Sequence, residues 1–475
     1  MTDRLPLPVL YQVRTWLQGL AMVALVVVSI ASCTPREEEI TPSASALLRL
    51  EADTVLFDTV FTQAGSVTKR LKVYNPNKNA VRISEIKVGG LQGSPFQVVV
   101  NGVPGPQVQN IELRGKDSLL VLVKATINPN AQEQPFLVQD SLLFLTNGNQ
   151  QKVKLVAYGQ NAAYYQGHYL TSPAEVWTAA KAHVIYDSVT VPAGQTLTIQ
   201  KGSQVHLYRN AKIRVLGTLK VEGEHEKRVV FQQVRKEEQY RNAPGQWQGL
   251  EFLPGSQNSE LRYVEVKNAV TGLYLKATGN QVPQVTLRHA FLKNMLQTGV
   301  LSHGGNVRLE NSVITNCGEY ALAGLGGGRY EVVFSTLANY ANEFIRLGPS
   351  FLFQERLEAG GRLVREGRYA VLVQNSILWG RQAEELKFSD MTGSSSRSIQ
   401  HSFLKTQAYQ REFDKNGNKI NVDPLFRDAP KFDFQLIKLS PANAAGAPVS
   451  GITVDYENKP RDAQKPDAGA FEVEY

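Results

Sequence analysis

The chain has 475 residues, of which 42% are hydrophobic, 20% charged and 9% aromatic. This is the composition of a globular protein, and it excludes wholesale disorder, a collagen-like repeat and a membrane protein with many spanning segments. Two cysteines exclude a disulfide scaffold, and 51 basic against 43 acidic residues leave a surplus too small, on so long a chain, to indicate nucleic acid as a partner.

The first 32 residues have the pattern of an export signal. Arg4 and Arg14 precede a strongly apolar run, Leu20 to Ile30, and small residues follow it. The run is shorter than the roughly 20 residues that a membrane-spanning helix needs. The tetrapeptide that ends at Cys33, Ile-Ala-Ser-Cys, resembles a bacterial lipobox, which implies lipidation of Cys33 and anchoring in a membrane. The alternatives are a plain signal peptide with an incidental cysteine, or an uncleaved anchor.

Residues 33–46 are expected to form a tether. Glu37, Glu38 and Glu39 follow Cys33 closely, and prolines and a Ser/Ala run come next. An acidic cluster at this place resembles the signal that sends lipoproteins to the outer face of the outer membrane in some Gram-negative bacteria. The predicted location is therefore the outer membrane, facing the cell exterior. In the mature chain Cys317 is then the one thiol besides the anchor.

Residues 47–160 are predicted to form an immunoglobulin-like β-sandwich. Short strand-like runs alternate with turn residues, and Asn147-Gly148 lies between two of the runs, as in a tight hairpin. About seven antiparallel strands in such a length are typical of this fold. The runs at 66–75 and 81–86 resemble the immunoglobulin-like domains related to the ASPM/SPD-2/Hydin group. The region has no cluster of titratable residues, which favours a spacer or docking module.

A repeat runs through the next part of the chain and predicts a parallel β-helix over residues 161–410. Six segments share the spacing apolar-x-x-small-x-apolar-x-Asn or an equivalent, and successive segments lie 22 to 41 residues apart. The longest step indicates one coil plus an insertion at about 341–369. The repeated segments begin at Leu261, Leu287, Leu309, Val332, Val373 and Ile399.

The columns of this repeat predict structural roles. Apolar positions point inward, and the small position is needed where the coil bends. The column Asn268, Asn294, Asn316 and Asn339 is expected to form a ladder of amides at a turn. Cys317 is interpreted as a buried filler rather than a nucleophile. His289 and His401 share a turn column, and no pair of histidines has metal-ligand spacing.

Two further stretches resemble known families. Residues 191–202, 213–223 and 246–250 resemble the opening coils of right-handed parallel β-helix proteins of the pectate-lyase-like superfamily. Residues 423–426, 433–436, 440–446 and 467–472 resemble the tail of "choice-of-anchor Q" β-helix proteins. The second resemblance implies that 411–475 form the end of the β-helix and its cap, with the aspartates as turn formers.

Catalytic residues of β-helix polysaccharide enzymes are not apparent. Such enzymes use carboxylates from successive coils, but no aspartate occurs between Asp187 and Asp390, and Glu265 and Glu310 lie in different columns. A possible calcium loop at 414–423 lacks the glycine position and the closing glutamate of an EF-hand, so an Asn-Gly turn is favoured. No cofactor or metal is expected.

An outward apolar stripe is the remaining unusual feature. The residue between the small and the second apolar position should face solvent, yet this column holds Glu265, Phe291, Val313, Thr336, Ile377 and Phe403. One hypothesis is that the insertion or the C-terminal tail covers the stripe. The other is a platform for a glycan or a partner, with basic residues nearby. The residues of this candidate binding face are Arg288, Phe291, Lys293, Arg308 and Phe403.

Taken together, these patterns predict an all-β, lipid-anchored protein of the cell envelope. The leading hypothesis is non-catalytic binding of a glycan or an envelope partner by the β-helix. The alternatives are a polysaccharide lyase or glycoside hydrolase, and a purely structural surface component. Enzymatic activity is left open.

Overall fold

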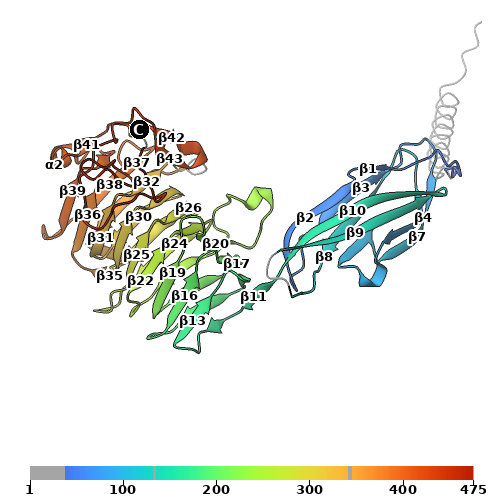
Figure 1. Cartoon of the computed structure of the whole chain (residues 1–475), viewed down its shortest axis with the longest axis horizontal. Helices are drawn as coiled ribbons and strands as arrows, with labels where there is room; N and C mark the ends of the chain where they lie inside the picture. The colour runs from blue at the N-terminus through green and yellow to red at the C-terminus, as the bar shows by residue number, and fades with distance from the viewer. Residues whose placement is uncertain (1–37, 132–134, 341–344, 474–475) are drawn as a thin grey trace, which may run out of the picture. The chain divides into compact units, whose positions relative to one another are not determined.

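The computed structural model describes residues 38–131, 135–340 and 345–473 (Figure 1). The predicted export signal, Cys33 and the start of the tether lie outside the described residues. Regular structure in the described part is almost all β-strand, which confirms the predicted all-β class. None of its helices has the length and apolar character to cross a membrane. The chain divides into two compact units. One holds the described residues up to Phe57 with Gly65–Thr126 and Val138–Ala157, and the other holds Asp58–Ala64, Ile127–Leu137 and the chain from Tyr158 onward.

The N-terminal part is a β-sandwich of two antiparallel sheets, as predicted. One sheet has the order β1-β3-β8-β5-β6, with β1 (Arg49–Leu50), β3 (Lys69–Tyr74), β8 (Ser118–Ala125), β5 (Phe96–Val100) and β6 (Val103–Pro104). The other has the order β2-β10-β9-β4-β7, with β2 (Thr54–Phe61), β10 (Asn149–Gln160), β9 (Phe136–Thr146), β4 (Val81–Val88) and β7 (Gln107–Leu113). A short 3₁₀ helix, η1 (Leu91–Gly93), follows β4.

Two asparagines stabilise the ends of strands in the sandwich. Asn147 and Gly148 both have positive φ, 49° and 82°, which is the requirement of the tight turn predicted between β9 and β10. The side chain of Asn75, at the end of β3, donates hydrogen bonds to the carbonyl oxygens of Asn79, Leu113 and Arg114. Asn75 is buried, and its three hydrogen bonds fix the chain where β3 ends.

The second unit is the predicted right-handed parallel β-helix, and its coils are built from three parallel sheets. Sheet 1 has the order β11 (Ala162–Tyr165), β14 (Ala182–Ile185), β17 (Gln204–Leu207), β20 (Val229–Gln233), β23 (Val264–Lys267), β26 (Phe291–Met295), β29 (Val313–Cys317), β32 (Thr336–Asn339), β37 (Ile377–Gly380), β40 (Phe403–Leu404) and β41 (Lys419–Ile420). Sheet 2 has the order β12 (His168–Tyr169), β15 (Ser188–Val191), β18 (Lys212–Val215), β21 (Gly249–Phe252), β24 (Thr271–Lys276), β27 (Thr298–His303), β30 (Leu322–Leu325), β33 (Phe351–Gln354) and β38 (Leu386–Ser389). Sheet 3 has the order β13 (Ala174–Trp177), β16 (Thr196–Gln200), β19 (Thr218–Glu222), β22 (Ser259–Arg262), β25 (Gln284–Arg288), β28 (Asn306–Glu310), β31 (Gly328–Val333), β36 (Tyr369–Gln374) and β39 (Ser396–Gln400).

Each coil buries an alternating set of apolar side chains, because neighbouring residues of a strand point to opposite faces. In sheet 1, equivalent residues of successive strands are in register and stack along the axis of the helix. This inward column consists of Val205, Phe231, Val266, Leu292, Ile314, Leu337, Leu378 and Leu404. All are buried in one continuous core. The core has no disulfide, and the thiol of Cys317 lies fully buried within it, as predicted.

The bend between sheets 3 and 1 shows why the repeat needs its small residues. The residue before each small position has a positive φ of 45° to 53°, as the predicted turn requires, at Tyr263, His289, Asn311, Phe334, Asn375 and His401. Serine hydroxyls then link the coils, because each accepts a hydrogen bond from the backbone N–H of the preceding coil. The N–H groups of Ala290, Ser312, Ser335 and Ser376 bond in this way to Ser312, Ser335, Ser376 and Ser402 at 3.1–3.2 Å.

The asparagine ladder is confirmed for three of its four members. The amide of Asn294 donates to Oδ1 of Asn268 at 3.1 Å, and the amide of Asn316 donates to Oδ1 of Asn294 at 2.7 Å. Asn339 instead bonds the backbone of Cys317 through both its amide oxygen and its amide nitrogen. These asparagines are buried and serve the turns.

The open end of the β-helix is closed by a short segment after β40. Helix α2 (Gln410–Phe413) places the side chain of Phe413 in the core of the coils, and β41 adds the last strand of sheet 1. Asn416 and Gly417 have φ of 53° and 73°, which agrees with the Asn-Gly turn preferred over a calcium loop. The end cap is therefore shorter than the predicted 411–475.

The rest of the C-terminal segment, residues 423–473, lies along the outer side of sheet 1 (Figure 1). It contains β42 (Phe426–Asp428), η3 (Ala429–Lys431) and β43 (Asp433–Leu436). It covers the outward apolar stripe: Val313 packs with Phe434, and Ile377 and Phe403 pack with Leu436. The stripe was expected to be covered by the insertion at about 341–369 or by the C-terminal tail, and the tail covers it. We call residues 423–473 the cover segment.

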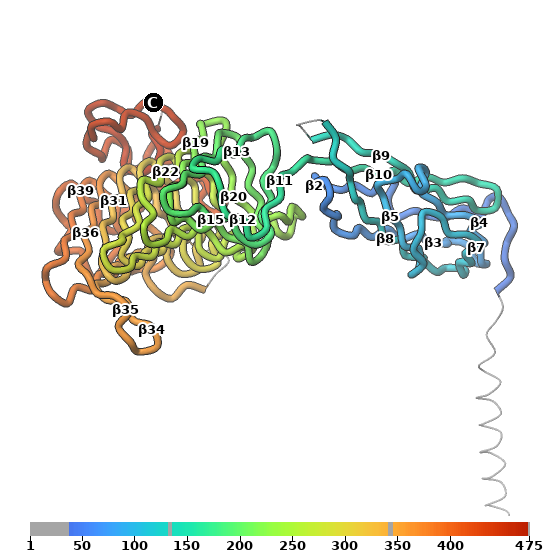
Figure 2. Tube along the Cα trace, turned by 90° about the horizontal axis from the view of Figure 1, so that it is seen from below, coloured from blue at the N-terminus to red at the C-terminus, as the bar shows by residue number. Residues whose placement is uncertain are grey.

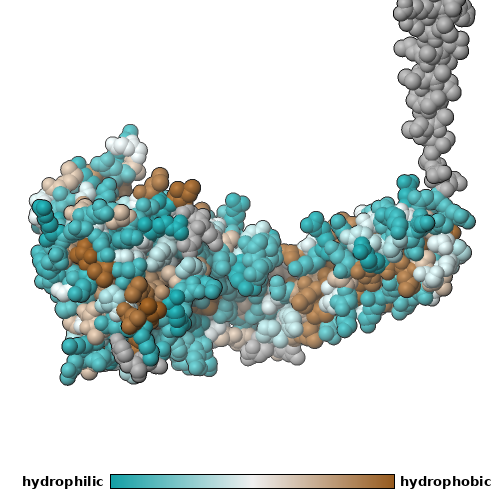
Figure 3. Space-filling view, turned by 90° about the horizontal axis from the view of Figure 1, so that it is seen from above, coloured by the Kyte–Doolittle hydropathy of each residue, from teal (hydrophilic) through white to brown (hydrophobic). Residues whose placement is uncertain are grey.

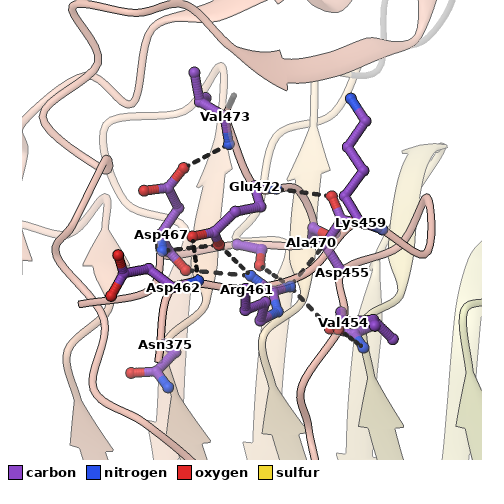
Figure 4. Close-up of polar contacts among 12 residues, drawn as sticks. Asn375, Val454, Asp455, Lys459, Arg461, Asp462, Asp467, Ala470, Glu472 and Val473 are labelled. Atoms are coloured by element: carbon purple, nitrogen blue, oxygen red, sulfur yellow. Dashed lines mark hydrogen bonds and ion pairs between the residues drawn. The ribbon is translucent and has the colours of Figure 1, made fainter. Parts of the chain in front are cut away.

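Arg461 fixes the cover segment to the coils (Figure 4). Its guanidinium donates to Oδ1 of Asn311 at 2.8 Å and to the carbonyl oxygens of Gly469 and Ala470. It also forms an ion pair with Glu472 at 3.2 Å and lies 4.1 Å from the ring centroid of Phe334. Asn311 and Phe334 belong to the coil turns, so this one buried side chain joins the two parts.

The aspartates of the cover segment are turn formers, as interpreted from the sequence. Asp455 accepts hydrogen bonds from the N–H groups of Glu457, Lys459 and Glu472, and Asp467 accepts them from Ala444 and Val473. Burial raises the pKa of both carboxyls. Their lone pairs are used within the segment, which leaves them poorly placed for chemistry on a ligand.

The predicted insertion at 341–369 is smaller than expected. Its first four residues lie outside the described residues, and β33 within it is an ordinary strand of sheet 2. The extra structure is a hairpin of β34 (Arg356–Ala359) and β35 (Arg362–Glu366), which projects from the coils (Figure 2). A short helix, η2 (Glu238–Tyr240), lies in the long connection between β20 and β21.

Candidate binding face

The five residues predicted to form one binding face lie on two different sheets. Arg288 and Arg308 belong to β25 and β28 of sheet 3. Phe291, Lys293 and Phe403 belong to β26 and β40 of sheet 1. The turn at His289 separates Arg288 from Phe291, so residues three apart in sequence point from different sides of the coil. The prediction that all five residues form a single face is therefore wrong.

The sheet 1 members are largely taken up by the cover segment. Phe403 is 0% exposed, and Phe291 is half-buried with its ring 6.2 Å from that of Tyr456. The ammonium group of Lys293 forms an ion pair with Glu265 at 3.0 Å. Phe403 thus belongs to a packed interior and is not accessible to a ligand.

The sheet 3 members form part of a continuous ion-pair network. Arg288 bonds Glu260 at 3.0 Å and Glu310 at 2.5 Å, and Arg308 bonds Glu310 at 3.2 Å and Glu331 at 2.5 Å. Arg329 completes it by bonding Glu331 at 2.7 Å. We call this set the arginine–glutamate network; its members are Glu260, Arg288, Arg308, Glu310, Arg329 and Glu331.

The electrostatics of the network disfavour acid catalysis. Burial alone would raise the pKa of Glu331, but hydrogen bonds from Arg329 and Arg308 outweigh it and lower that pKa. The same partnership raises the pKa of Arg308 against the opposing effect of burial. A general acid needs a carboxyl that is protonated at the working pH. Glu331 is instead held as a carboxylate.

A shallow depression of about 210 Å³ adjoins the end of the network. Its cause is the register of sheet 3: Arg329, Ala370 and Ser396 form one outward column, and Glu331, Leu372 and Ser398 form the next. Because Ala370 and the two serines are short, the surface falls away beside the long side chains of Arg329 and Glu331. Arg329 keeps 68% of its side chain exposed and can still meet a ligand.

The other reactive side chains have structural surroundings. Burial lowers the pKa of His289 to about 4, and its ring stacks on Tyr263 with centroids 4.3 Å apart. Burial raises the pKa of the Cys317 thiol to about 12, which disfavours the thiolate that a nucleophilic cysteine needs. Within the described ranges, no three His, Cys, Asp or Glu side chains are grouped so as to hold a metal ion.

The surface of the second unit is otherwise mainly hydrophilic in the view of Figure 3. Hydrophobic residues gather there in small separate groups. Single exposed apolar residues are normal on a soluble surface. The depression of sheet 3 differs from these groups in its polar and charged lining, which includes Arg329, Ser396 and Ser398.

Comparisons with known proteins do not assign the chain to a family. No protein-family model matches it, and no curated protein does. Among solved structures it is similar to a family 123 glycoside hydrolase from Clostridium perfringens, at 8% identity over 24% of this chain and 26% of that one, with a TM-score of 0.18. The E. coli chaperone DraB matches at 18% identity over 26% and 57% of the two chains (TM-score 0.17), and the YadV chaperone at 10% over 23% and 50% (TM-score 0.16). Likenesses this limited carry no argument about function.

Proposed function

We propose that this protein is a lipid-anchored component of the cell envelope that binds an acidic glycan along sheet 3 without cleaving it. The observation that carries the proposal is the depression beside Arg329, with its serines and short apolar floor. The proposal accounts for the export signal and acidic tether at the N-terminus and for the β-helix at the C-terminus.

The chemistry of the depression suits a sugar carboxylate. Arg329 presents a planar guanidinium, which pairs with carboxylates through two parallel hydrogen bonds. Ser396 and Ser398 supply hydroxyl groups, and Ala370 and Leu372 supply a small apolar surface for the C–H face of a ring. Adjacent strands of a sheet lie about 4.8 Å apart. That spacing is comparable with the length of one sugar unit, so successive coils can meet successive units.

Binding is favoured over catalysis by the state of the carboxylates. A hydrolase needs one protonated and one ionised carboxyl flanking the bond to be cut, and a lyase needs a base free to take a proton. In the arginine–glutamate network, each of Glu310 and Glu331 is held by two arginines. Release of products would indicate a lyase or hydrolase, and a chain that retains no glycan would indicate a purely structural component.

Blocking the depression or removing its guanidinium should weaken binding. We expect Ser398→Trp, which fills the depression, and Arg329→Ala, which removes the cation, each to raise the Kd for polygalacturonate at least about tenfold, or 1.4 kcal/mol. Affinity electrophoresis with the polymer in the gel measures this. The matched control is Thr198→Trp, which lies in the same outward column as Ser398 but several coils away. Equal affinity of Ser398→Trp and Thr198→Trp would reject the site.

The anchor has its own test. Cys33→Ser removes the residue that the lipobox resemblance marks for acylation. We expect the wild-type chain to take up radiolabelled palmitate and to sediment with membranes, and the variant to do neither. Cys317→Ser is the control, because Cys317 is buried and should leave labelling unchanged. Palmitate incorporation by Cys33→Ser would contradict the proposed anchor.

A further inference from the structure

The β34–β35 hairpin has strand edges without a partner. It forms a sheet of two strands only, so each strand has one side whose backbone groups pair with no other strand of the described chain. Free strand edges of this kind are templates for pairing with another chain, and proteins normally cover or disrupt them. The edge of β34 is of particular interest because of what lies beside it.

A cavity of about 420 Å³ adjoins β34 and not β35. Three successive residues of β34 line it, while β35 contributes none. The opposite wall comes from the strand end and loop after β38, and the floor comes from β30 and β33 of sheet 2. The residues used below are Leu325, Arg356, Leu357, Glu358, Ser389 and Met391. This volume lies in the range of sites that hold a ligand group.

Both walls of the cavity are held rigidly. The carboxylate of Glu355, at the base of the hairpin, accepts hydrogen bonds from the N–H of Met391 at 2.8 Å, from the N–H of Thr392 at 3.0 Å and from the hydroxyl groups of Thr392 and Ser395. Its carbonyl oxygen accepts the N–H of Gly367 at 2.9 Å. Glu355 thereby joins the hairpin to the facing loop, so little ordering remains to be done when a ligand enters.

Arg365 of β35 anchors the hairpin to the coils. Its Nε donates to the carbonyl oxygen of Gly326 at 3.0 Å. A Cβ at Gly304 would lie 2.1 Å from the same Nε, so the glycine leaves room for this contact. The anchor is on β35, which leaves the edge of β34 free beside the cavity.

The lining of the cavity indicates what it accepts. Leu325, Leu357 and Met391 form an apolar group, and Met391 is 62% exposed although the loop that carries it is fixed. The side chain of Glu358 has no hydrogen bond or ion pair within the described part of the chain, whereas Arg356 is paired with Glu366 at 3.3 Å. The charged group at the cavity without a partner among the described residues is therefore the carboxylate of Glu358, which suits a basic group of a ligand.

We propose that the free edge of β34 binds an extended segment of a partner protein by strand addition. The segment becomes the third strand of the hairpin sheet, places one apolar side chain among Leu325, Leu357 and Met391, and sets a Lys or Arg against Glu358. Backbone hydrogen bonds supply affinity in this mode of recognition, and the cavity supplies specificity. The cavity beside β34 and the depression on sheet 3 share no lining residue, so this proposal does not depend on the glycan site.

Selection of a random heptapeptide library displayed on phage tests the proposal. With the full mature chain as bait, we expect enrichment of peptides that carry an apolar residue with a basic residue near it. The enriched peptide is then synthesised and its Kd measured on wild type, Leu357→Asp, Glu358→Lys and the control Val364→Asp. Val364 is 60% exposed on β35 and does not line the cavity. Leu357→Asp and Glu358→Lys should weaken binding at least about tenfold, and Val364→Asp should not.

Two further results distinguish strand addition from other modes. A peptide with its basic residue changed to Glu should regain affinity for Glu358→Lys, and hydrogen exchange should slow in residues 356–359 when the peptide is bound. Failure to enrich any peptide, or binding equally strong in Leu357→Asp, would overturn the proposal. Binding without slowed exchange in β34, as expected for a sugar in the cavity, would overturn it as well.

Discussion

Replacing Arg461 by Met is expected to destabilise the attachment of the cover segment by about 3–5 kcal/mol, the usual cost of breaking a buried ion pair from one side. The change leaves the carboxylate of Glu472 without its cation, and Oδ1 of Asn311 and the carbonyl oxygens of Gly469 and Ala470 without their donor. Hydrogen exchange of residues 437–473 measures the effect as a fall in the free energy of local opening.

Arg427 offers the matched control for Arg461. It is also an arginine of the cover segment paired with a carboxylate, that of Asp433, but its side chain is 57% exposed. Exposed pairs contribute about 0–1 kcal/mol. If Arg427→Met and Arg461→Met proved equally mild, Arg461 would not be a main link between the cover segment and the coils.

Phe403→Ala is expected to cost about 3–5 kcal/mol of stability, the range found when a buried phenylalanine is truncated. The ring is fully buried against Leu436 and Ala442 of the cover segment and against Trp379 of the neighbouring coil. Chemical unfolding followed by tryptophan fluorescence reports the loss. Glycan binding should persist under native conditions, because Phe403 lies on sheet 1.

The comparison for Phe403 is Leu439→Ala, in a side chain that is 85% exposed on the same segment. This variant should change stability by less than about 0.5 kcal/mol. A platform role for Phe403 predicts the reverse, namely little change in stability and a loss of binding. The two variants therefore decide between a packed stripe and a ligand platform.

The repeat could be predicted from the sequence because each of its columns meets one physical requirement of the coil. The positive φ at His289 and His401 calls for residues that tolerate a left-handed turn. The buried hydroxyls of Ser312, Ser335 and Ser376 fit the narrow bend and accept hydrogen bonds from the preceding coil. Such requirements are local and recur every coil, so a single chain displays them many times.

The site was predicted only in part because it depends on register between coils. Arg308 and Glu331 are 23 residues apart and touch only because β28 and β31 pair in register. The depression beside Arg329 arises from short residues in two later strands, Ala370 and Ser396 among them. Spacing within one strand contains no sign of either feature. Aligning the coils by their inward columns would have revealed both.

The grouping of Phe291 with Arg288 failed for a related reason. The two residues are close in sequence, but one tight turn directs them to different sheets. The covering role of the tail was one of two open possibilities, since an apolar stripe looks the same in sequence whether solvent or a distant segment covers it. Long-range packing of this kind has no local signature.

The central claim, binding of an acidic glycan without cleavage, is tested most directly by incubating the mature chain with polygalacturonate, alginate and chondroitin sulfate. Retention on the polymer and release of products are measured on the same samples. The account predicts retention by at least one polymer, weakened by Ser398→Trp, and no new reducing ends or unsaturated products. Product formation from any of the three, or no retention by all of them, would contradict it.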